Sequence, residues 1–287
     1  LETLAAPNPD ILEHPIVKKF EVHQVDCCRF EGVSDLRAVN RKEWKKLLEE
    51  YTSSCIDESI AEMNSWNVNV GCFYKKKSFY SSKGAKIVQD MQTCWLNVGF
   101  GFTVDGVTTY GGKGYHKLSF EELSGYTAEI LQERARYLDF ARNAVNVEPG
   151  EYTCVLSPNA TAMFTHESFG HKSETDYMLN DKTLQDEWVM GKRVASEKVS
   201  ICDDGSLLNH GYTPYDDEGT KARKSWLMRN GVLTGRLHDA KSATTLQEEL
   251  TGNARARDCI FSPIVRMTNT YMLAGQDDPR KMIEEVR

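Results

Sequence analysis

Several features are scarce in this sequence, and each absence excludes a class of protein. No stretch of the chain approaches about eighteen uncharged apolar residues, and the N-terminus LETLAAPNPD lacks the basic start and apolar run of a signal peptide. Lysine and arginine form no long run, and the formal net charge is −7, so few groups would neutralise the phosphates of a nucleic acid. We therefore expect a soluble, cytoplasmic protein that binds neither membranes nor nucleic acid.

Regularly spaced cysteines are also missing. The chain has 8 cysteines, but they are scattered and no two of them form a CxxC pair. A disulfide-stapled secreted domain or a cysteine-based zinc site would require close, regular pairs. We therefore expect buried, reduced thiols. Neither standard Gly-rich phosphate loop is present.

What is present favours an α+β fold of two domains, each an antiparallel sheet with packed helices. With 287 residues, 40% of them hydrophobic, the chain can form two ordinary cores. Asn40 and Glu43 have the spacing of a capping box that opens a helix. The segment 67–110 contains short β-rich runs, with a strong hairpin signal at Asp105-Gly106.

A domain boundary is expected near the middle of the chain. Ser119 and Glu122 form a second possible capping box, which predicts a long helix that ends before Pro149-Gly150. We place the boundary there, so that the domains are 1–148 and 149–287.

The second half begins with a predicted strand and helix. Tyr152 to Leu156 has a strand pattern, and Ser157 followed by Pro158 is typical of a helix start. Farther on, Asn230-Gly231 predicts another hairpin, and Arg266 to Met272 is a strand candidate.

The segment HESFGH, from His166 to His171, is the most informative motif. Two histidines and Glu167 supply two nitrogen ligands and a carboxylate, the groups that a metal-activated water needs for attack on a peptide carbonyl. Histidines four residues apart lie about 40° apart around a helix, but histidines five apart lie about 140° apart. A shared ion therefore requires either a wider π-type turn or a helix that ends at Gly170. We predict a local break at Gly170.

Nearby charged residues allow two interpretations each. Glu174 and Asp176 are candidates for carboxylates that orient the histidine rings, or are solvated charges. Arg255 and Arg257 could bind a substrate carboxylate or an oxyanion, or they could pair with an acidic cluster. Of these alternatives the structural ion pair is favoured, because arginines more commonly have that role.

Three further groups stay open at this point. The acidic cluster Asp216–Glu218 could line a cleft or form an exposed turn. His210 and His238 are spare metal-ligand candidates, although isolated histidines are more often simply hydrogen-bonded. His166 and His171 themselves could be a core histidine and a helix-end histidine.

Five ordered blocks favour the metal-binding interpretation of His166 and His171, because together they resemble a known family. The blocks are HESFGHKSETD, KRVASEKVSICDDG, YDDEGT, GNARARD and RMTNTYMLAG. They resemble the TldD/PmbA family of zinc metallopeptidases, also called modulators of DNA gyrase, and the HExxxH motif is similar to that of its TldD-like members. The resemblance implies that 1–148 is the later part of an N-terminal α+β domain and that 149–287 is a metallopeptidase domain truncated at its C-terminus. We expect further sequence beyond both ends.

The resemblance also implies a site and an activity. His166 and His171 would bind Zn²⁺, Glu167 would be the catalytic base, and the third protein ligand would be a C-terminal cysteine that this chain does not contain. The expected substrate is an unfolded or extended peptide, and the expected assembly is a homodimer or a heterodimer with a PmbA-like subunit. The alternative is a non-catalytic member or partner subunit that assembles a chamber or binds a regulator.

Overall fold

The structure, a computed structural model, describes residues 9–28 and 34–286 and divides into two compact units. Unit 1 comprises residues 1–28, 77–89 and 151–287, and unit 2 comprises residues 29–76 and 90–150. The chain therefore passes from unit 2 to unit 1 for the last time directly after Pro149-Gly150. Whether the units act as separate domains with the expected bounds stays a prediction.

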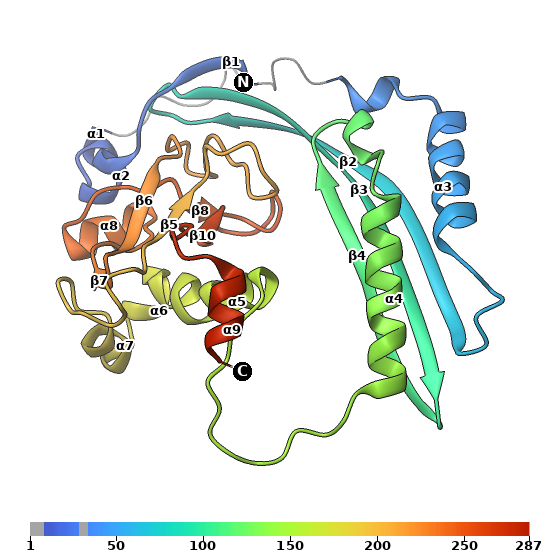
Figure 1. Ribbon diagram of the computed structural model, residues 1–287. Coiled ribbons are helices and arrows are strands. Elements are labelled where there is room, and N and C mark those ends of the chain that lie inside the picture. The colour runs from blue at the N-terminus through green and yellow to red at the C-terminus, as the bar shows by residue number, and fades with distance from the viewer. Residues whose placement is uncertain (1–8, 29–33, 287) are drawn as a thin grey trace. The chain divides into compact units, whose positions relative to one another are not determined.

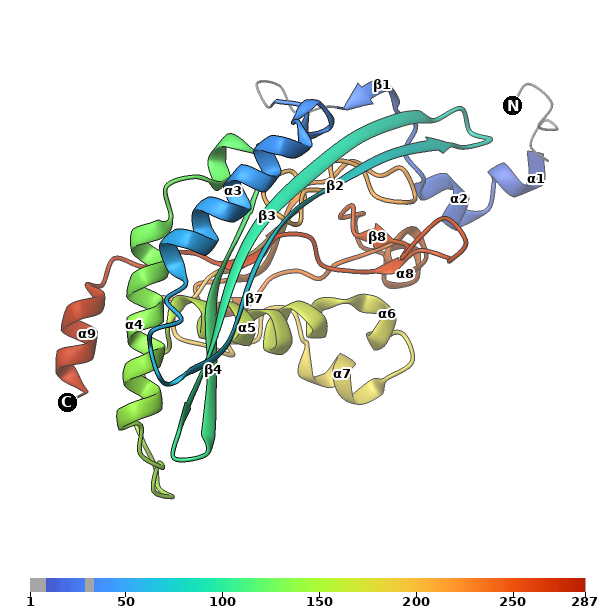
Figure 2. The ribbon, with the colours of Figure 1, turned by 90° about the vertical axis from the view of Figure 1, so that its right-hand side faces the viewer.

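Unit 2 is built on long strands covered by two helices (Figure 1). Its elements are η1 (Leu36–Ala38), α3 (Arg41–Cys55), most of β2 (Met63–Tyr80), most of β3 (Lys86–Val104), β4 (Val107–Lys117), η2 (Glu121–Leu123) and α4 (Thr127–Asn143). Strand β3 is central: it pairs with β2, and its later part pairs in antiparallel register with β4 from Cys94 to Val104. Figure 2 shows α3 and α4 lying along these strands.

The turns and caps of unit 2 follow from local sequence. The capping box of Asn40 and Glu43 is confirmed, because each side chain bonds the other's backbone N–H. The hairpin at Asp105-Gly106 is confirmed as well, with φ of 50° and 79° at its two central residues, the left-handed values that this tight turn requires.

The core of unit 2 forms between one face of β3 and the two helices. Alternate residues of β3 are buried, from Cys94 to Phe102, and they join Tyr51 of α3 and Ile130 of α4 in one cluster. The period of two along β3 identifies the buried face of the sheet. The Tyr51 hydroxyl is also satisfied, because it donates to the carbonyl of Leu123 at 2.8 Å.

The second predicted capping box closes a short turn rather than the long helix. Glu122 accepts from both the backbone N–H and the hydroxyl of Ser119, but the helix there is the three-residue η2. The chain then passes through Gly125 at φ 91°, and α4 begins only at Thr127. An L-residue would be strained at this φ, so the glycine permits the interruption that the capping pattern did not predict.

Unit 1 combines small sheets with short helices. Its N-terminal elements are α1 (Pro9–Leu12), α2 (Pro15–Lys19) and β1 (Gln24–Cys28), which pairs in parallel with the start of β3. Its helices after residue 150 are α5 (Pro158–Thr165), η3 (His166–Gly170), η4 (His171–Ser173), α6 (Thr175–Met178), α7 (Lys182–Glu187), α8 (Ala240–Leu246) and α9 (Pro279–Glu285). Its strands after that residue are β5 (Ile201–Asp204), β6 (Lys224–Arg229), β7 (Val232–Leu233), β8 (Ala254–Arg255), β9 (Ile264–Val265) and β10 (Thr270–Met272).

The later strands of unit 1 form an antiparallel four-stranded sheet in the order β10-β5-β6-β7 and a separate pair, β8-β9. The predicted hairpin at Asn230-Gly231 joins β6 to β7. Antiparallel pairing and packed helices in both units confirm the predicted α+β class.

Two strand predictions in unit 1 need correction. Tyr152 to Leu156 is not a strand, because every residue of this segment is exposed and no ladder forms along it. Of the predicted strand from Arg266 to Met272, only Thr270–Met272 is a strand. Local patterning cannot supply the partner strand on which a β assignment depends.

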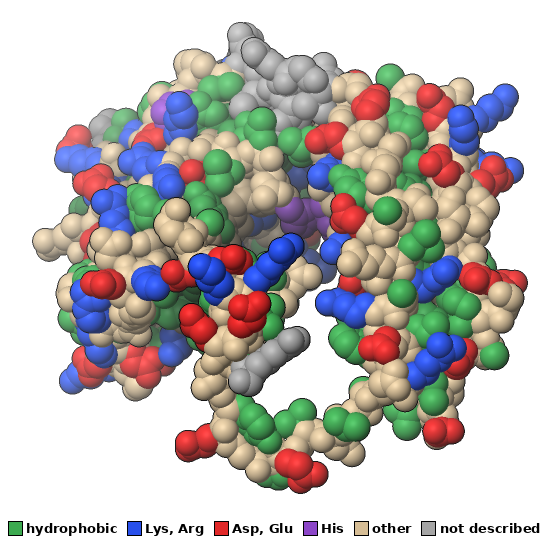
Figure 3. Space-filling model, viewed as in Figure 1, with side chains coloured by type: hydrophobic (Ala, Val, Ile, Leu, Met, Phe, Trp, Pro, Cys, Tyr) green, Lys and Arg blue, Asp and Glu red, His purple; other side chains and the backbone are tan. Residues whose placement is uncertain are grey.

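The surface carries charges of both signs. Figure 3 shows acidic and basic side chains interspersed over the face drawn there. Among the described residues, no helix combines the length and apolar character that a bilayer crossing would require. The cysteine prediction is only partly right: free cysteines at 55, 94 and 202 are buried, whereas those at 72, 154 and 259 are exposed.

Candidate metal centre

The histidine motif lies at the end of a helix that the sequence starts strongly. Ser157 caps α5 by accepting from the backbone N–H of Ala160 at 3.3 Å, and Pro158 is the first helical residue. Both features satisfy or remove N–H groups that a helix start leaves without partners. The helix therefore begins eight residues before His166, and the histidine motif follows directly at its C-terminal end.

A π turn brings the two histidines together. The residues His166–Gly170 form the π segment η3, and the backbone N–H of His171 donates to the carbonyl of His166, five residues earlier. This is the first of the two geometries that the spacing allowed. At Gly170 the helix changes type and continues as the 3₁₀ turn η4, so the chain does not leave the helix there as a simple break would.

The turn places three potential metal ligands in one cluster. One ligand atom each from His166, Glu167 and His171 lies within 4.8 Å of the others. The histidine ring centroids are 4.7 Å apart, and the ring planes are nearly perpendicular. Two imidazoles and one carboxylate form a donor set that suits zinc. The residues present therefore fit the ion that the family resemblance implies.

Gly170 is required by packing. It is buried, and a Cβ atom added there would lie 2.0 Å from Sδ of Met267 and 3.0 Å from its Cε. Its φ of −60° is ordinary for any residue, so the restriction is steric and not conformational. Met267, which lies between β9 and β10, can therefore approach the π turn only because Gly170 has no side chain.

Replacing Gly170 with alanine is expected to destabilise the fold by about 1–3 kcal/mol, because overpacking forces Met267 or the turn to move. Thermal unfolding would measure this loss, and zinc affinity should fall with it. Ser168→Ala, in the same turn, is the matched control and should leave both nearly unchanged. An alanine variant with unaltered melting temperature and zinc affinity would show that the turn is not held by this contact.

Glu174 orients His171 from inside the protein. Its side chain is fully buried, and Oε2 lies 3.2 Å from Nδ1 of His171. Oε2 also accepts from Arg266 at 2.8 Å, and Oε1 accepts from the backbone N–H of Met267 at 3.2 Å. Burial raises the pKa of Glu174, while the bond to His171 and the charge of Arg266 act in the opposite direction. A carboxylate at this distance can accept the Nδ1 proton of His171, which would leave Nε2 with a lone pair for a metal.

Asp176 acts one step farther away. Its carboxylate lies 3.8 Å from Nη1 of Arg266, and burial raises its pKa. The side chain of Asp176 thus faces the arginine that holds Glu174 and accepts from the backbone N–H of Tyr177 at 3.0 Å, rather than contacting a histidine ring. Arg266 was not among the predicted site residues, because the strand pattern of RMTNTYM gives no signal that its first residue lines the pocket.

A pocket of about 350 Å³ opens beside the histidines. Its lining includes His166, His171 and Glu174, together with three arginines, Arg255, Arg257 and Arg266. The two predicted arginines therefore lie at the same site as the two predicted histidines. Arg255 donates from Nη1 to the carbonyl of Met267 at 2.7 Å, and the guanidinium of Arg257 lies 5.8 Å from the ring of Phe261.

The acidic cluster Asp216–Glu218 supports the backbone beside these arginines. Asp216 accepts from the N–H of Ala254 at 3.0 Å, and Asp217 accepts from the N–H of Ala256 at 2.8 Å. The cluster is buried or half-buried, so it is not the exposed turn that such runs usually form. Asp216 and Asp217 thus hold the backbone of β8 and its continuation rather than the guanidinium groups of that segment, while Glu218 accepts from the N–H of Ala240 at the start of α8.

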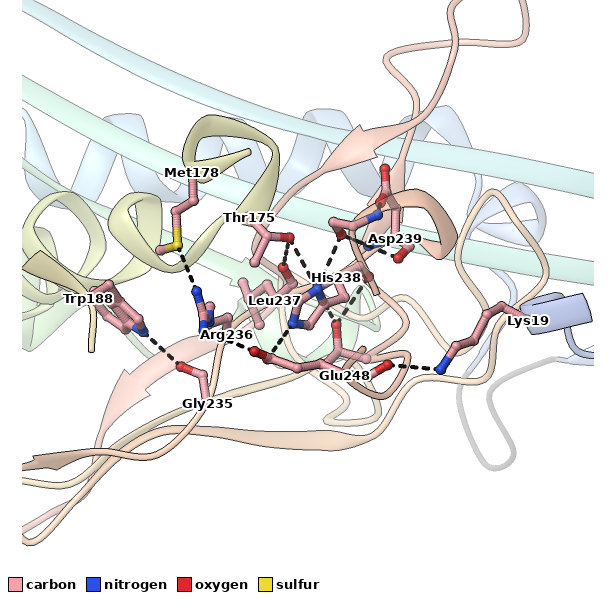
Figure 4. A network of polar contacts seen from close by, with 12 residues as sticks. Lys19, Thr175, Met178, Trp188, Gly235, Arg236, Leu237, His238, Asp239 and Glu248 are labelled. Atoms are coloured by element: carbon pink, nitrogen blue, oxygen red, sulfur yellow. Dashed lines mark hydrogen bonds and ion pairs between the residues drawn. The ribbon is translucent and has the colours of Figure 1, made fainter. Parts of the chain in front are cut away.

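The spare histidines have other surroundings. His210 lies on the surface. His238 is buried, and both of its ring nitrogens are engaged: Nε2 lies 2.8 Å from Glu248, and Nδ1 lies 3.2 Å from Ser242 and 3.3 Å from Thr175 (Figure 4). His238 therefore joins the start of α6 to α8, and it is not part of the histidine cluster.

This network predicts a pH dependence of stability. The hydrogen bond with His238 and the charge of Arg236 hold the pKa of Glu248 below its ordinary value of 4.5. The unfolded chain therefore binds the proton more tightly, so the stabilisation is complete above about pH 4.5 and is lost as the pH falls through the lower folded pKa. Glu248→Gln should cost about 1 kcal/mol near neutrality and progressively less in acid, measured by denaturant unfolding. An equal cost at all pH values would contradict this account.

The C-terminal half of the chain matches a known protein family. Residues 149–287 match the profile of the PmbA/TldA metallopeptidase C-terminal domain. This segment is therefore similar to the PmbA/TldD metallopeptidase family. The resemblance drawn from the five sequence blocks is thereby confirmed.

Curated relatives of this chain carry consistent names. A metalloprotease from Methanocaldococcus jannaschii is 29% identical over 99% of this chain and 62% of its own length. A zinc metalloprotease TldD homolog from Saccharolobus solfataricus is 26% identical over 74% of this chain and 48% of its own length. The chain thus spans less than two thirds of the length of these relatives.

Solved structures agree on the fold. A protein from Thermotoga maritima, described as a candidate modulator of a DNA gyrase, superposes with a TM-score of 0.73 at 20% identity, over 93% of this chain and 60% of that one. TldE from Thermococcus kodakarensis gives a TM-score of 0.62 at 16% identity, with the same coverage of both chains. At these identities the similarity concerns the fold alone.

Proposed function

We propose that this protein is a zinc-dependent peptidase that hydrolyses unfolded or extended peptides, with Glu167 as general base. The observation that carries the proposal is the π turn, which gathers His166, Glu167 and His171 within 4.8 Å beside a pocket. The names of the relatives, metalloprotease and zinc metalloprotease, support the same class of reaction.

The roles of the chain's own residues follow from their positions. His166 and His171 would hold the ion, and Glu174 would keep the ring of His171 in one orientation. When bound, zinc makes a water molecule acidic enough to supply hydroxide near neutral pH and polarises the peptide carbonyl. Glu167 is exposed, so it can take a proton from the attacking water and deliver it to the leaving amine. The third protein ligand remains the C-terminal cysteine implied by the family resemblance.

An extended substrate suits the walls of the pocket. Arg255 and Ile264, which line it, belong to the strands β8 and β9. A peptide lying along such a strand would be bound through main-chain hydrogen bonds, which depend little on its sequence. A complex with a bound peptide tests this point, because the peptide should show main-chain pairing beside the histidines.

The assembly and location are part of the proposal. Fold similarity to TldE, together with relatives named TldD homolog, supports a partnership of the TldD and PmbA type, as a heterodimer or homodimer. A cytoplasmic location remains a prediction from the sequence. The alternative of a non-catalytic partner subunit is less favoured, because the chain retains both histidines and the glutamate in one cluster.

Metal analysis combined with a cleavage assay tests the activity. The full-length protein, alone and with a PmbA-like partner, should contain zinc and cleave an unstructured peptide, as followed by mass spectrometry. Removing the metal with a chelator should stop cleavage, and added zinc should restore it. Zinc-free protein that cleaves at the original rate, or zinc-loaded protein that cleaves no peptide in either form, would overturn the proposal.

A further inference from the structure

The charges that line the histidine pocket are unbalanced. Three arginines line it, at positions 255, 257 and 266, but Glu174 is the one carboxylate among its lining residues. That carboxylate is already bound to Arg266, which also faces Asp176 at 3.8 Å. The remaining two guanidinium groups therefore give the pocket an excess of positive charge.

Arg255 and Arg257 keep donors that the protein does not use. Arg255 donates from Nη1 to a backbone carbonyl, and Arg257 contacts an aromatic ring. Among the described residues, neither guanidinium forms an ion pair with a carboxylate. The nearby carboxylates of Asp216 and Asp217 are engaged with the backbone N–H groups of Ala254 and Ala256. The segment thus presents two arginines to the pocket while its acidic neighbours hold its backbone.

We propose that Arg255 and Arg257 bind a carboxylate of the substrate, so that the peptidase selects peptides carrying a negative charge close to the cleaved bond. This inference rests on the proposed function and narrows its substrate class. A guanidinium presents its donors in a planar fork that matches a carboxylate, often through two parallel hydrogen bonds. The carboxylate is either the C-terminal group of a short peptide or an acidic side chain.

The other ligand that these arginines suit is the oxyanion of the transition state, and kinetics separate the two. A group that binds a substrate carboxylate acts equally in the ground state and the transition state, so its loss raises KM and leaves kcat unchanged. A group that binds only the oxyanion lowers kcat instead. Substitution of the arginines is thus expected to raise KM, whereas substitution of the general base Glu167 is expected to lower kcat.

Peptide binding gives a test that needs no hydrolysis. The full-length Glu167→Gln protein, loaded with zinc, would be titrated calorimetrically with three versions of one peptide. The first has a free C-terminus and neutral side chains, the second has an amidated C-terminus and one acidic side chain, and the third is amidated and neutral. We expect one of the two charged versions to bind at least about tenfold more tightly than the neutral one, and this version identifies the source of the carboxylate.

The variants Arg255→Gln and Arg257→Gln should each remove most of this preference, measured as the ratio of the affinities for the charged and the neutral peptide. Arg223→Gln is the matched control: Arg223 pairs with Glu21 and lines a different pocket, so the preference should persist. If Arg255→Gln fails to fold because its bond to Met267 is lost, Arg257→Gln still carries the test. The inference would be overturned if all three peptides bound equally well to the protein that retains both arginines. It would also be overturned if the preference survived both substitutions. The proposed hydrolysis could stand in either case.

Discussion

Exchanging Glu167 for glutamine is expected to reduce kcat for peptide hydrolysis by about 10²–10⁴-fold, the usual contribution of a general base. The two side chains have the same shape, and Glu167 is exposed, so folding should be unaffected. Zinc content should stay at the level of the unaltered protein, because His166 and His171 remain in place. Steady-state kinetics together with metal analysis would measure both quantities.

Glu187→Gln is the control for this experiment. Glu187 is another exposed glutamate of unit 1 and pairs with Lys172 on the surface, so its loss should change neither zinc content nor kcat. Wild-type turnover by the Glu167 variant would show that another group takes the proton. Loss of zinc from that variant would instead make Glu167 a ligand, as its place in the cluster also permits.

The second large effect is expected from Glu174→Ala. This change removes the acceptor of the Met267 N–H and one of the two acceptors of Arg266 Nη1, which keeps the carbonyl of Val265, and it frees the ring of His171. Loss of a group that orients a metal ligand costs about 10–100-fold in metal affinity, and an unsatisfied buried donor costs about 1–3 kcal/mol of stability. Competition with a zinc indicator and thermal unfolding would measure the two effects.

Glu174→Gln separates the two effects of that substitution. Glutamine keeps the volume and one acceptor oxygen but removes the charge, so stability should recover more than zinc affinity does. Asp176→Asn should have a smaller effect on both, because Asp176 lies 3.8 Å from Arg266. Unchanged zinc affinity in Glu174→Ala would show that His171 is oriented by something else.

Local features of the fold could be predicted from the sequence. The capping box at Asn40, the hairpin at Asp105-Gly106 and the helix start at Ser157-Pro158 all depend on contacts between residues close in the chain. The same reasoning limited the histidine motif to two geometries, because residues five apart cannot share an ion on a regular α-helix. The spacing led to the prediction of a break at Gly170, whereas the structure has the wider π turn.

The choice depends on residues far away in the sequence. Met267 packs against Gly170 almost a hundred positions earlier, and Arg266 reaches Glu174 across 92 positions. No periodicity or spacing near the motif contains these contacts. For the same reason Tyr152 to Leu156 was wrongly predicted as a strand, since its pattern is suitable but no partner strand is paired with it.

The central claim is that the π turn lets His166 and His171 bind one zinc ion. Anomalous diffraction at the zinc absorption edge, from crystals of the full-length protein, tests this directly. We expect a single peak about 2.0–2.1 Å from one ring nitrogen of each histidine. A peak bound elsewhere, or zinc-soaked crystals with no peak between the two rings, would contradict the account.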